Sequence, residues 1–164
     1  MALAEYRKRR HFNETPEPRG KRQAGKFAQP IFVVQKHHAR SLHYDFRLQV
    51  GGVLASWAVP KGPSMKASDK RLAVRTEDHP MEYAAFEGEI PKGHYGAGSV
   101  EIWDKGTYRV DGDDSVAQQL KNGKLEFTLA GKKLVGGFVL ICTGRGWLLI
   151  KRRGATGDKR RVPV

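Results

Sequence analysis

Two histidines and an aspartate stand at a spacing that could bind a metal ion. His37 lies six residues before His43, and Asp45 follows two residues later, inside the alternating run 42–50. Alternation of polar and apolar residues predicts an extended strand, because successive side chains point to opposite faces. His43, Asp45 and Arg47 would then share one face. Two imidazoles and a carboxylate are a typical ligand set for Mn, Fe, Zn or another first-row divalent ion.

The residues around this set support the interpretation. Arg47 follows on the same face and could hold an anion bound to the metal through both of its terminal nitrogens. The β-branched run 31–37 predicts a second strand that places Gln35 and His37 on one side, whereas His38 falls on the other side. An ordinary solvated face is the alternative interpretation. Such faces favour Lys, Glu and Thr over a His-x-Asp-x-Arg sequence, so we prefer the metal site.

The composition indicates one globular domain. A chain of 164 residues with 39% apolar residues is long enough for one hydrophobic core. The single cysteine, Cys142, excludes an internal disulfide framework and fits a reducing compartment; its apolar surroundings predict a buried, inert thiol. The sequence contains neither an apolar segment of membrane-spanning length nor a signal peptide. These features predict a cytoplasmic protein, associated with the nucleoid if its partner is DNA.

The positive charge is concentrated at the two ends of the chain. Of the net +13, residues 1–30 contribute eight basic and three acidic side chains, and residues 151–164 contribute six and one. We therefore predict a basic, partly flexible N-terminal arm over 1–30, a barrel domain over 31–152 and a basic C-terminal tail over 153–164. Basic ends on a nearly balanced core indicate a polyanionic partner, with nucleic acid as the first candidate. Tails that only aid solubility are the alternative.

The predicted elements indicate an all-β fold. Short alternating runs separated by Gly, Pro and Asp predict strands at 31–37, 43–50, 53–59, 71–76, 99–103, 107–110, 124–129, 134–142 and 147–151. Short helical segments are expected at 2–10, 81–86 and 114–121, the last with Asp113 or Asp114 as its cap. We expect a small closed or nearly closed β-barrel of about eight strands with short helical turns. A polar interior would place the active site in the barrel mouth.

Four further motifs follow in order along the chain. They read Arg-Leu-Ala-Val at 71–74, Glu-Asp-His-Pro at 77–80, Tyr-Ala-x-Phe-Glu-Gly at 83–88 and Gly-His-Tyr-Gly-Ala-Gly at 93–98. The last motif belongs to a long Gly-rich loop, a type of segment that often carries function. Together with the metal candidates and the run 56–63, this ordered set resembles the 3′-phosphoesterase domain of bacterial DNA ligase D and its stand-alone archaeal and bacterial relatives. The resemblance covers about residues 5–151.

The resemblance implies roles for individual residues. Those that match the manganese ligands are His37, His43 and Asp45, and Co²⁺, Zn²⁺ or another divalent ion could occupy the same site. Those that match groups holding the scissile phosphate are Arg47, Arg71, His79 and Tyr83. Those that match supporting positions are Gln35, Glu77, Lys61 and Glu17. The chain departs from the family at His11, where relatives often carry an acid, so we assign no catalytic role there.

The function implied is the healing of DNA 3′ ends in double-strand break repair by non-homologous end joining. The enzyme would remove a 3′-terminal ribonucleoside to leave a 3′-phosphate and then hydrolyse that phosphate to a 3′-hydroxyl. Its substrates would be primer–template 3′ ends that carry a ribonucleotide or a 3′-phosphate. A repair polymerase and an ATP-dependent ligase would act as separate partners, or as further modules of a longer chain from which this sequence comes, since we see neither module here. No membrane partner is expected.

The residue types are consistent with phosphoester hydrolysis. A metal with three protein ligands keeps positions open for water and phosphate, and it lowers the pKa of the bound water. No Ser or Cys lies in a nucleophile motif, so we favour direct attack by water over a covalent histidine intermediate. His79 could serve as a general acid or as a phosphate hydrogen-bond donor, and the sequence does not separate these roles.

Two other functions compete with the phosphoesterase. A His-x-Asp pair with a distant His is also the facial triad of non-haem Fe(II) oxygenases, although several arginines would be unusual there. A non-catalytic nucleic-acid-binding β-barrel would use the basic ends together with Trp57, Trp103 or Trp147 as stacking platforms. Tryptophans inside strands are more often part of a core.

Overall fold

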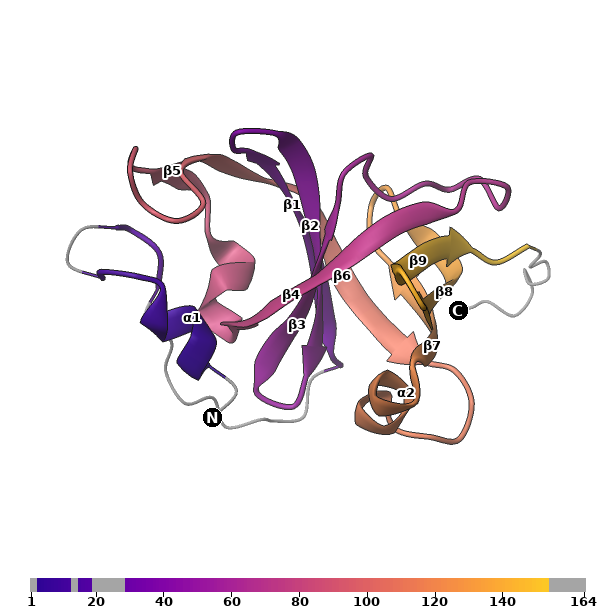
Figure 1. Ribbon diagram of the computed structural model, residues 1–164. Helices are drawn as coiled ribbons and strands as arrows, with labels where there is room; N and C mark the ends of the chain where they lie inside the picture. Colours follow the sequence, from indigo (N-terminus) through magenta and orange to yellow (C-terminus); the bar gives the residue numbers. More distant parts are fainter. Residues whose placement is uncertain (1–2, 13–14, 19–28, 154–164) are drawn as a thin grey trace.

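The computed structural model describes residues 3–12, 15–18 and 29–153 (Figure 1). Within these ranges the strands are β1 (Ile31–His38), β2 (Leu42–Val50), β3 (Val53–Val59), β4 (Arg71–Pro80), β5 (Gly88–Ile90), β6 (Gly98–Val110), β7 (Lys124–Ala130), β8 (Val135–Thr143) and β9 (Gly146–Lys151). The helices are α1 (Ala4–Lys8), the 3-10 helix η1 (Met81–Ala85) and α2 (Val116–Asn122). None of these helices has the length and apolar character needed to cross a lipid bilayer.

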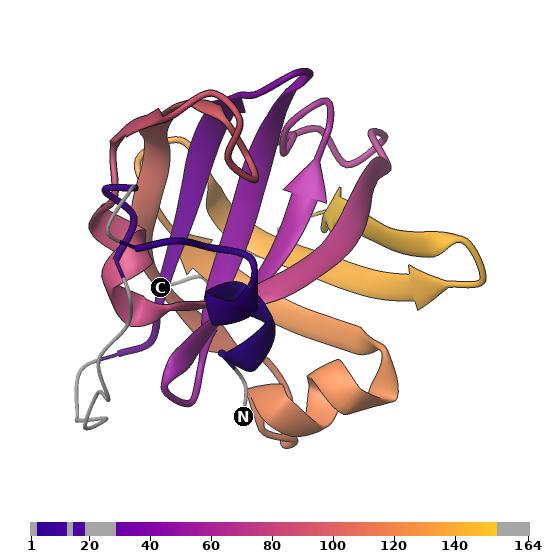
Figure 2. The ribbon, with the colours of Figure 1, turned by 60° about the vertical axis from the view of Figure 1, so that its left-hand side comes forward.

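The strands close into an antiparallel barrel. Their order is β1-β2-β3-β4-β9-β8-β7-β6, and pairing between β1 and β6 completes the ring, while β5 adds a short ninth strand to β6. Helices α1 and η1 lie together on one side of the barrel, and α2 lies with β7 on the other (Figures 1 and 2). The predicted eight-stranded β-barrel with short helical turns is thereby confirmed.

The barrel interior is apolar. Alternate residues of β2 and β3, including Phe46 and Trp57, meet Phe127 and Phe138 from the opposite strands in one buried cluster. The ring centre of Phe46 lies 6.4 Å from that of Trp57 and 6.0 Å from that of Phe127. Such close packing of large apolar side chains leaves no polar interior, and it holds β1 and β2 in a fixed register.

A second, smaller apolar cluster lies on the outer face of the same strands. Leu54 belongs to it, whereas the adjacent Ala55 belongs to the interior cluster, so the two clusters lie on opposite faces of β3. Tyr6 of α1 and Tyr83 of η1 cover this outer face and are almost completely buried. The outer surface of β1–β4 is therefore sheltered over part of its length by α1, η1 and β5.

The predicted site residues do not line a polar barrel interior, as had been expected. Phe46 points into the barrel, so its neighbours Asp45 and Arg47 point to the outer face. Gln35 of β1 pairs with Asp45 and lies on the same outer face. The alternation was identified correctly, but the apolar residues fill the barrel and the polar ones meet the layer formed by α1 and η1.

Two predicted strands form a single one. The runs 99–103 and 107–110 both belong to β6, which pairs with β1 from Ser99 to Thr107 across an irregularity between Val34 and Gln35. A glycine is required at position 106 by a close approach of backbones, because a Cβ atom there would lie 2.1 Å from the carbonyl oxygen of Ala130.

Three smaller expectations also change. Strand β4 continues through Glu77–Pro80, because His79 pairs with Leu54 beyond a bulge. The cap of α2 is Ser115, whose hydroxyl accepts from the backbone N–H of the third helical residue, and neither predicted aspartate has this role. Cys142 is exposed at the end of β8 instead of buried. The helical segments predicted at 2–10 and 81–86 are present as α1 and η1.

The described part of the predicted N-terminal arm packs on the barrel. Tyr6 is completely buried and Glu17 nearly so, and both lie against the outer face of β4 and η1. The division into arm, barrel domain and tail remains a prediction. Of the predicted tail 153–164, all residues after 153 lie outside the described ranges.

Candidate active site

His37, His43 and Asp45 form a compact donor cluster at one end of the β1–β2 pair. His37 pairs directly with His43, and one possible ligand atom from each of the three residues lies within 4.8 Å of the others. The Oδ2 atom of Asp45 lies 3.4 Å from Nδ1 of His37, and its Oδ1 atom lies 3.2 Å from Nε2 of His43. This arrangement fits a divalent metal ion.

Backbone carbonyl groups orient both imidazoles. Nε2 of His37 lies 2.8 Å from the oxygen of Gly96, and Nδ1 of His43 lies 3.2 Å from the oxygen of Ser41. Because a carbonyl oxygen only accepts, these nitrogens carry the protons, and the other nitrogen of each neutral ring directs a lone pair towards Asp45. Lone pairs facing a carboxylate at this distance need a cation between them, which is either a proton on the ring nitrogen or a metal ion. The arrangement is the usual one around a bound metal.

When no metal is bound, a proton on Nε2 of His43 can take the place of that cation and donate to Asp45, and the pKa values of the two groups reflect this contact. Burial alone would raise the pKa of Asp45, but Arg47 and the hydrogen bonds with His37 and His43 outweigh it, so the pKa lies far below its usual value. The hydrogen bond with Asp45 raises the pKa of His43 against the effect of burial. Asp45 therefore stays ionised throughout the physiological range, as a metal ligand requires.

Arg47 lies next to the donor cluster and is held in one position. Its Nη2 atom lies 3.4 Å from Oδ2 of Asp45, and its Nε donates to Oε1 of Gln35 over 2.7 Å. Gln35 in turn donates to the backbone oxygen of Tyr83 over 2.7 Å. The guanidinium also lies 4.9 Å from the centre of the Tyr83 ring. This buried cation is thereby fixed between the donor cluster and His79, whose Nδ1 is 3.3 Å from Arg47 Nη1.

His79 is buried and neutral. Burial, followed by the charges of Arg47 and Arg10, holds its pKa well below the usual value. Nδ1 lies 3.0 Å from the backbone oxygen of Glu77, which can only accept, and 3.3 Å from Nη1 of Arg47, which can only donate, so these two neighbours favour opposite tautomers of the ring. The ring of Tyr83 packs edge-on at 4.7 Å, as the proximity of the two residues in the sequence suggested.

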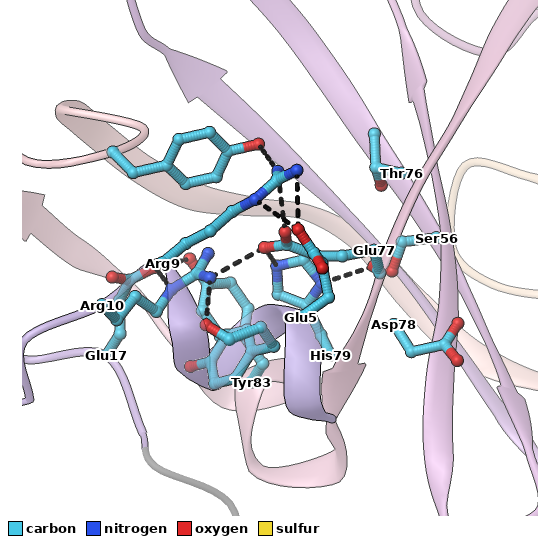
Figure 3. Close-up of polar contacts among 12 residues, drawn as sticks. Glu5, Arg9, Arg10, Glu17, Ser56, Thr76, Glu77, Asp78, His79 and Tyr83 are labelled. Carbon is cyan, nitrogen blue, oxygen red and sulfur yellow. Dashed lines mark hydrogen bonds and ion pairs between the residues drawn. The ribbon is translucent and has the colours of Figure 1, made fainter. Parts of the chain in front are cut away.

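A buried network of charges supports His79 (Figure 3). Arg10 donates from Nη1 to Glu77 over 2.7 Å and from Nε to Glu17 over 3.0 Å. The hydroxyl of Tyr83 also donates to Glu17, over 2.8 Å. Sequence reasoning proposed Glu77, Glu17 and Tyr83 for the site, and the structure brings them together around one arginine. It missed Arg10, because the run 7–10 was interpreted only as part of a basic arm.

Two of the predicted residues lie apart from this network. Arg71 stands at the opposite end of β4 from His79, about 26 Å away along the strand, and its guanidinium is 3.5 Å from Asp69. Lys61 is exposed just after β3. Val59 pairs with Tyr44, so Lys61 lies at the same end of the sheet as the donor cluster. The phosphate-holding role of Arg71 and the supporting role of Lys61 remain predictions.

The tryptophans bear on the non-catalytic alternative. Trp57 and Trp147 are buried in the interior cluster with ring centres 5.5 Å apart, and Trp103 packs against that cluster. Trp57 and Trp147 are therefore core residues and do not form stacking platforms for nucleic acid. Stacking of nucleic-acid bases on Trp57 or Trp147 is therefore not supported.

Comparison with known proteins identifies the family of this chain. Residues 35–142 match the family model described as the DNA ligase D 3′-phosphoesterase domain. The chain is 49% identical over 157 residues to the multifunctional non-homologous end joining protein LigD of Pseudomonas aeruginosa, covering 92% of this chain and 18% of that protein. It is 47% identical to LigD of Mycolicibacterium smegmatis (89% and 20%) and to LigD of Mycobacterium tuberculosis (96% and 20%). It thus spans about a fifth of the length of these relatives. The chain belongs to the family of DNA ligase D 3′-phosphoesterase domains.

Proposed function

We propose that this protein is a divalent-metal-dependent phosphoesterase that heals DNA 3′ ends. It removes a 3′-terminal ribonucleoside to leave a 3′-phosphate, and then hydrolyses the phosphate to a 3′-hydroxyl. The observation that carries the proposal is the position of Arg47, whose guanidinium lies 3.4 Å from Asp45 of the donor cluster and 3.3 Å from His79. A phosphate bound there would meet metal ligands, a fixed cation and an imidazole on one face of the barrel.

The metal and Arg47 have different roles in the proposed reaction. A bound metal supplies charge neutralisation and an activated water, and Mn²⁺ is the ion we propose, with Co²⁺ and Zn²⁺ as candidates for the same ligands. Arg47 binds the non-bridging oxygens in bidentate fashion, because Gln35 already fixes its Nε side. Since this guanidinium is oriented before the substrate arrives, it stabilises negative charge as it develops on the phosphate.

His79 serves the phosphate in a different way. In the absence of substrate its ring is neutral, because burial and two neighbouring guanidinium groups oppose a third positive charge. A bound phosphate dianion supplies the missing negative charge and favours protonation of the ring, whose Nε2 can then donate to the phosphate or to the leaving oxygen. We therefore infer that His79 contributes more to the monoester step than to the diester step. Tyr83 and the Arg10–Glu17–Glu77 network hold it in place.

The proposed substrate is the 3′ end of a primer–template. Lys61 lies at the donor-cluster end of the sheet and would contact backbone phosphates of the retained strand. The relatives are named multifunctional end-joining proteins, which supports a role in non-homologous end joining. We propose that a repair polymerase and an ATP-dependent ligase act on the healed ends, and that the protein works at the nucleoid.

The test is a time course on a primer with one 3′-terminal ribonucleotide. Wild-type protein with Mn²⁺ should form the 3′-phosphate first and the 3′-hydroxyl later. Arg47→Ala should lose both products, and His79→Ala should accumulate the 3′-phosphate. Arg109→Ala removes the same charge from an exposed side chain of β6 and serves as the control. If Arg47→Ala forms both products at the wild-type rate, the proposed phosphate site is wrong.

A further inference from the structure

Tyr95 is an exposed aromatic side chain beside the site that the proposed mechanism does not use. It belongs to the Gly-rich loop between β5 and β6, and it is 50% exposed. An aromatic ring of this size normally buries most of its apolar surface. Two guanidinium groups lie near it, with Arg9 4.9 Å and Arg10 5.5 Å from the ring centre, and half of the residue nevertheless remains open.

Tyr95 is connected to the proposed phosphate site in two ways, through its hydroxyl group and through the backbone. Its hydroxyl accepts from Arg9 over 2.8 Å, and Arg9 also donates to Oε1 of Glu77 over 3.0 Å. The other oxygen of that carboxylate lies 3.8 Å from Nε2 of His79. On the backbone side, the next residue is Gly96, whose oxygen lies 2.8 Å from His37. These two connections place Tyr95 at the edge of the phosphate position.

The cations around Tyr95 are already neutralised. Arg9 forms ion pairs with Glu5 and Glu77, and Arg10 forms ion pairs with Glu17 and Glu77. This side of the site therefore presents an exposed aromatic ring, and the arginines beside it already have carboxylate partners. A retained DNA strand brings a phosphate with every nucleotide and needs cations, whereas a terminal nucleoside brings a base and a sugar with no phosphate beyond the scissile one.

We propose that Tyr95 forms a nucleoside subsite, on which the base of the 3′-terminal ribonucleotide stacks during the diester step. This inference rests on the proposed function and specifies where the leaving nucleoside binds. Aromatic stacking accepts every base because each has a π-face, so the subsite selects for the presence of a base and not for its identity. The monoester step involves no terminal nucleoside beyond the phosphate, so it does not use Tyr95 in this way.

The experiment compares Tyr95→Ala and Tyr95→Phe on three primers. One ends in a ribonucleotide, the second ends in the same ribose without a base, and the third ends in a 3′-phosphate. Tyr95→Ala should lower kcat/KM about 5- to 150-fold on the first primer, the range that base–aromatic stacking provides. It should leave the other two unchanged. Tyr95→Phe keeps the ring and loses only the hydroxyl, so it should resemble wild type on all three.

Two outcomes would overturn the subsite. An equal loss on the primers with and without a base would show that Tyr95 only supports the loop that holds His37. A loss in Tyr95→Phe as large as in Tyr95→Ala would assign the effect to the hydrogen bond with Arg9.

A binding measurement tests the nucleoside subsite independently of the proposed hydrolytic function. A primer ending in 2-aminopurine riboside should lose fluorescence on binding wild type or Tyr95→Phe, and keep it on binding Tyr95→Ala. If no 3′ end is hydrolysed, the function fails while this readout still decides the subsite. Equal quenching by wild type and Tyr95→Ala would contradict stacking.

Discussion

Replacing Glu77 by glutamine should destabilise the protein strongly, because it removes the shared anion of a buried charge network. The carboxylate side chain is 3% exposed, and Oε2 accepts from Arg10, whose side chain is 5% exposed, over 2.7 Å. Oε1 accepts from Arg9, whose side chain is 41% exposed. The substitution keeps the size of the side chain, so the lost charge dominates the change.

The expected loss of unfolding free energy depends on which arginine loses its carboxylate partner. A buried charge that loses its partner costs about 3–5 kcal/mol. Arg10 keeps its second partner, Glu17, at 3.0 Å, so we expect the lower end, about 3 kcal/mol. For a domain of this size that corresponds to a fall in Tm of about 9 °C. Arg9 is largely solvated, and Arg9→Ala should cost about 1 kcal/mol or less, although it contacts the same carboxylate.

Urea unfolding of wild type, Glu77→Gln and Arg9→Ala at pH 7, followed by circular dichroism, measures both values. The comparison is matched, because the two substitutions remove opposite ends of one ion pair and differ in burial. If Glu77→Gln costs no more than Arg9→Ala, burial does not govern this network. The description of Arg10 as a buried cation that depends on Glu77 would then be wrong.

Three further predictions concern stability, pH and metal affinity. The carboxylate of Asp104 accepts three backbone N–H groups, that of Leu134 at 2.8 Å among them, so Asp104→Ala should cost about 3 kcal/mol of unfolding free energy in urea. Burial and neighbouring guanidinium groups lower the pKa of His79 in the folded state, so the unfolded state binds more protons below about pH 6.5. The unfolding free energy in chelator should fall as the pH decreases through that range, and His79→Asn should flatten the fall; an unchanged slope would contradict the assignment. Gly96 has φ +79°, a conformation that L side chains rarely adopt, and its carbonyl group orients the imidazole of His37, so Gly96→Ala should displace this carbonyl and weaken Mn²⁺ binding about 10-fold by calorimetry. Gly93→Ala is the control, since φ there is +86° and a Cβ would meet no atom within 4 Å; equal affinities in the two variants would argue against the orienting carbonyl.

The local part of the fold could be predicted from the sequence. Strand β2 alternates because one face packs in the interior, and β3 was predicted with its observed bounds, Val53–Val59. The donor cluster could be predicted from the same alternation, because His43 and Asp45 must share one face of β2. His37 joins them because it pairs with His43. These features depend on residues that are close in sequence or paired across one hairpin.

The features that were missed depend on distant packing. Both Val33 and Val34 are completely buried, so β1 alone does not reveal which of its faces points into the barrel. The cover provided by α1 and η1 comes from segments far away in the chain. Arg10 was missed for the same reason, because its anionic partner Glu77 is 67 residues away. A basic run predicts solvated charge, and only tertiary structure shows which member is buried.

The central claim is that the outer-face cluster binds a metal that the protein uses to hydrolyse DNA 3′-phosphoesters. Release of inorganic phosphate from a 3′-phosphorylated oligonucleotide tests this most directly, with chelator-treated protein to which Mn²⁺ is returned. Wild type should release phosphate only after Mn²⁺ is added, and Asp45→Asn should release none at the same Mn²⁺ concentration while keeping the wild-type circular dichroism spectrum. Phosphate release by Asp45→Asn at the wild-type rate, or by wild type in chelator, would contradict the account.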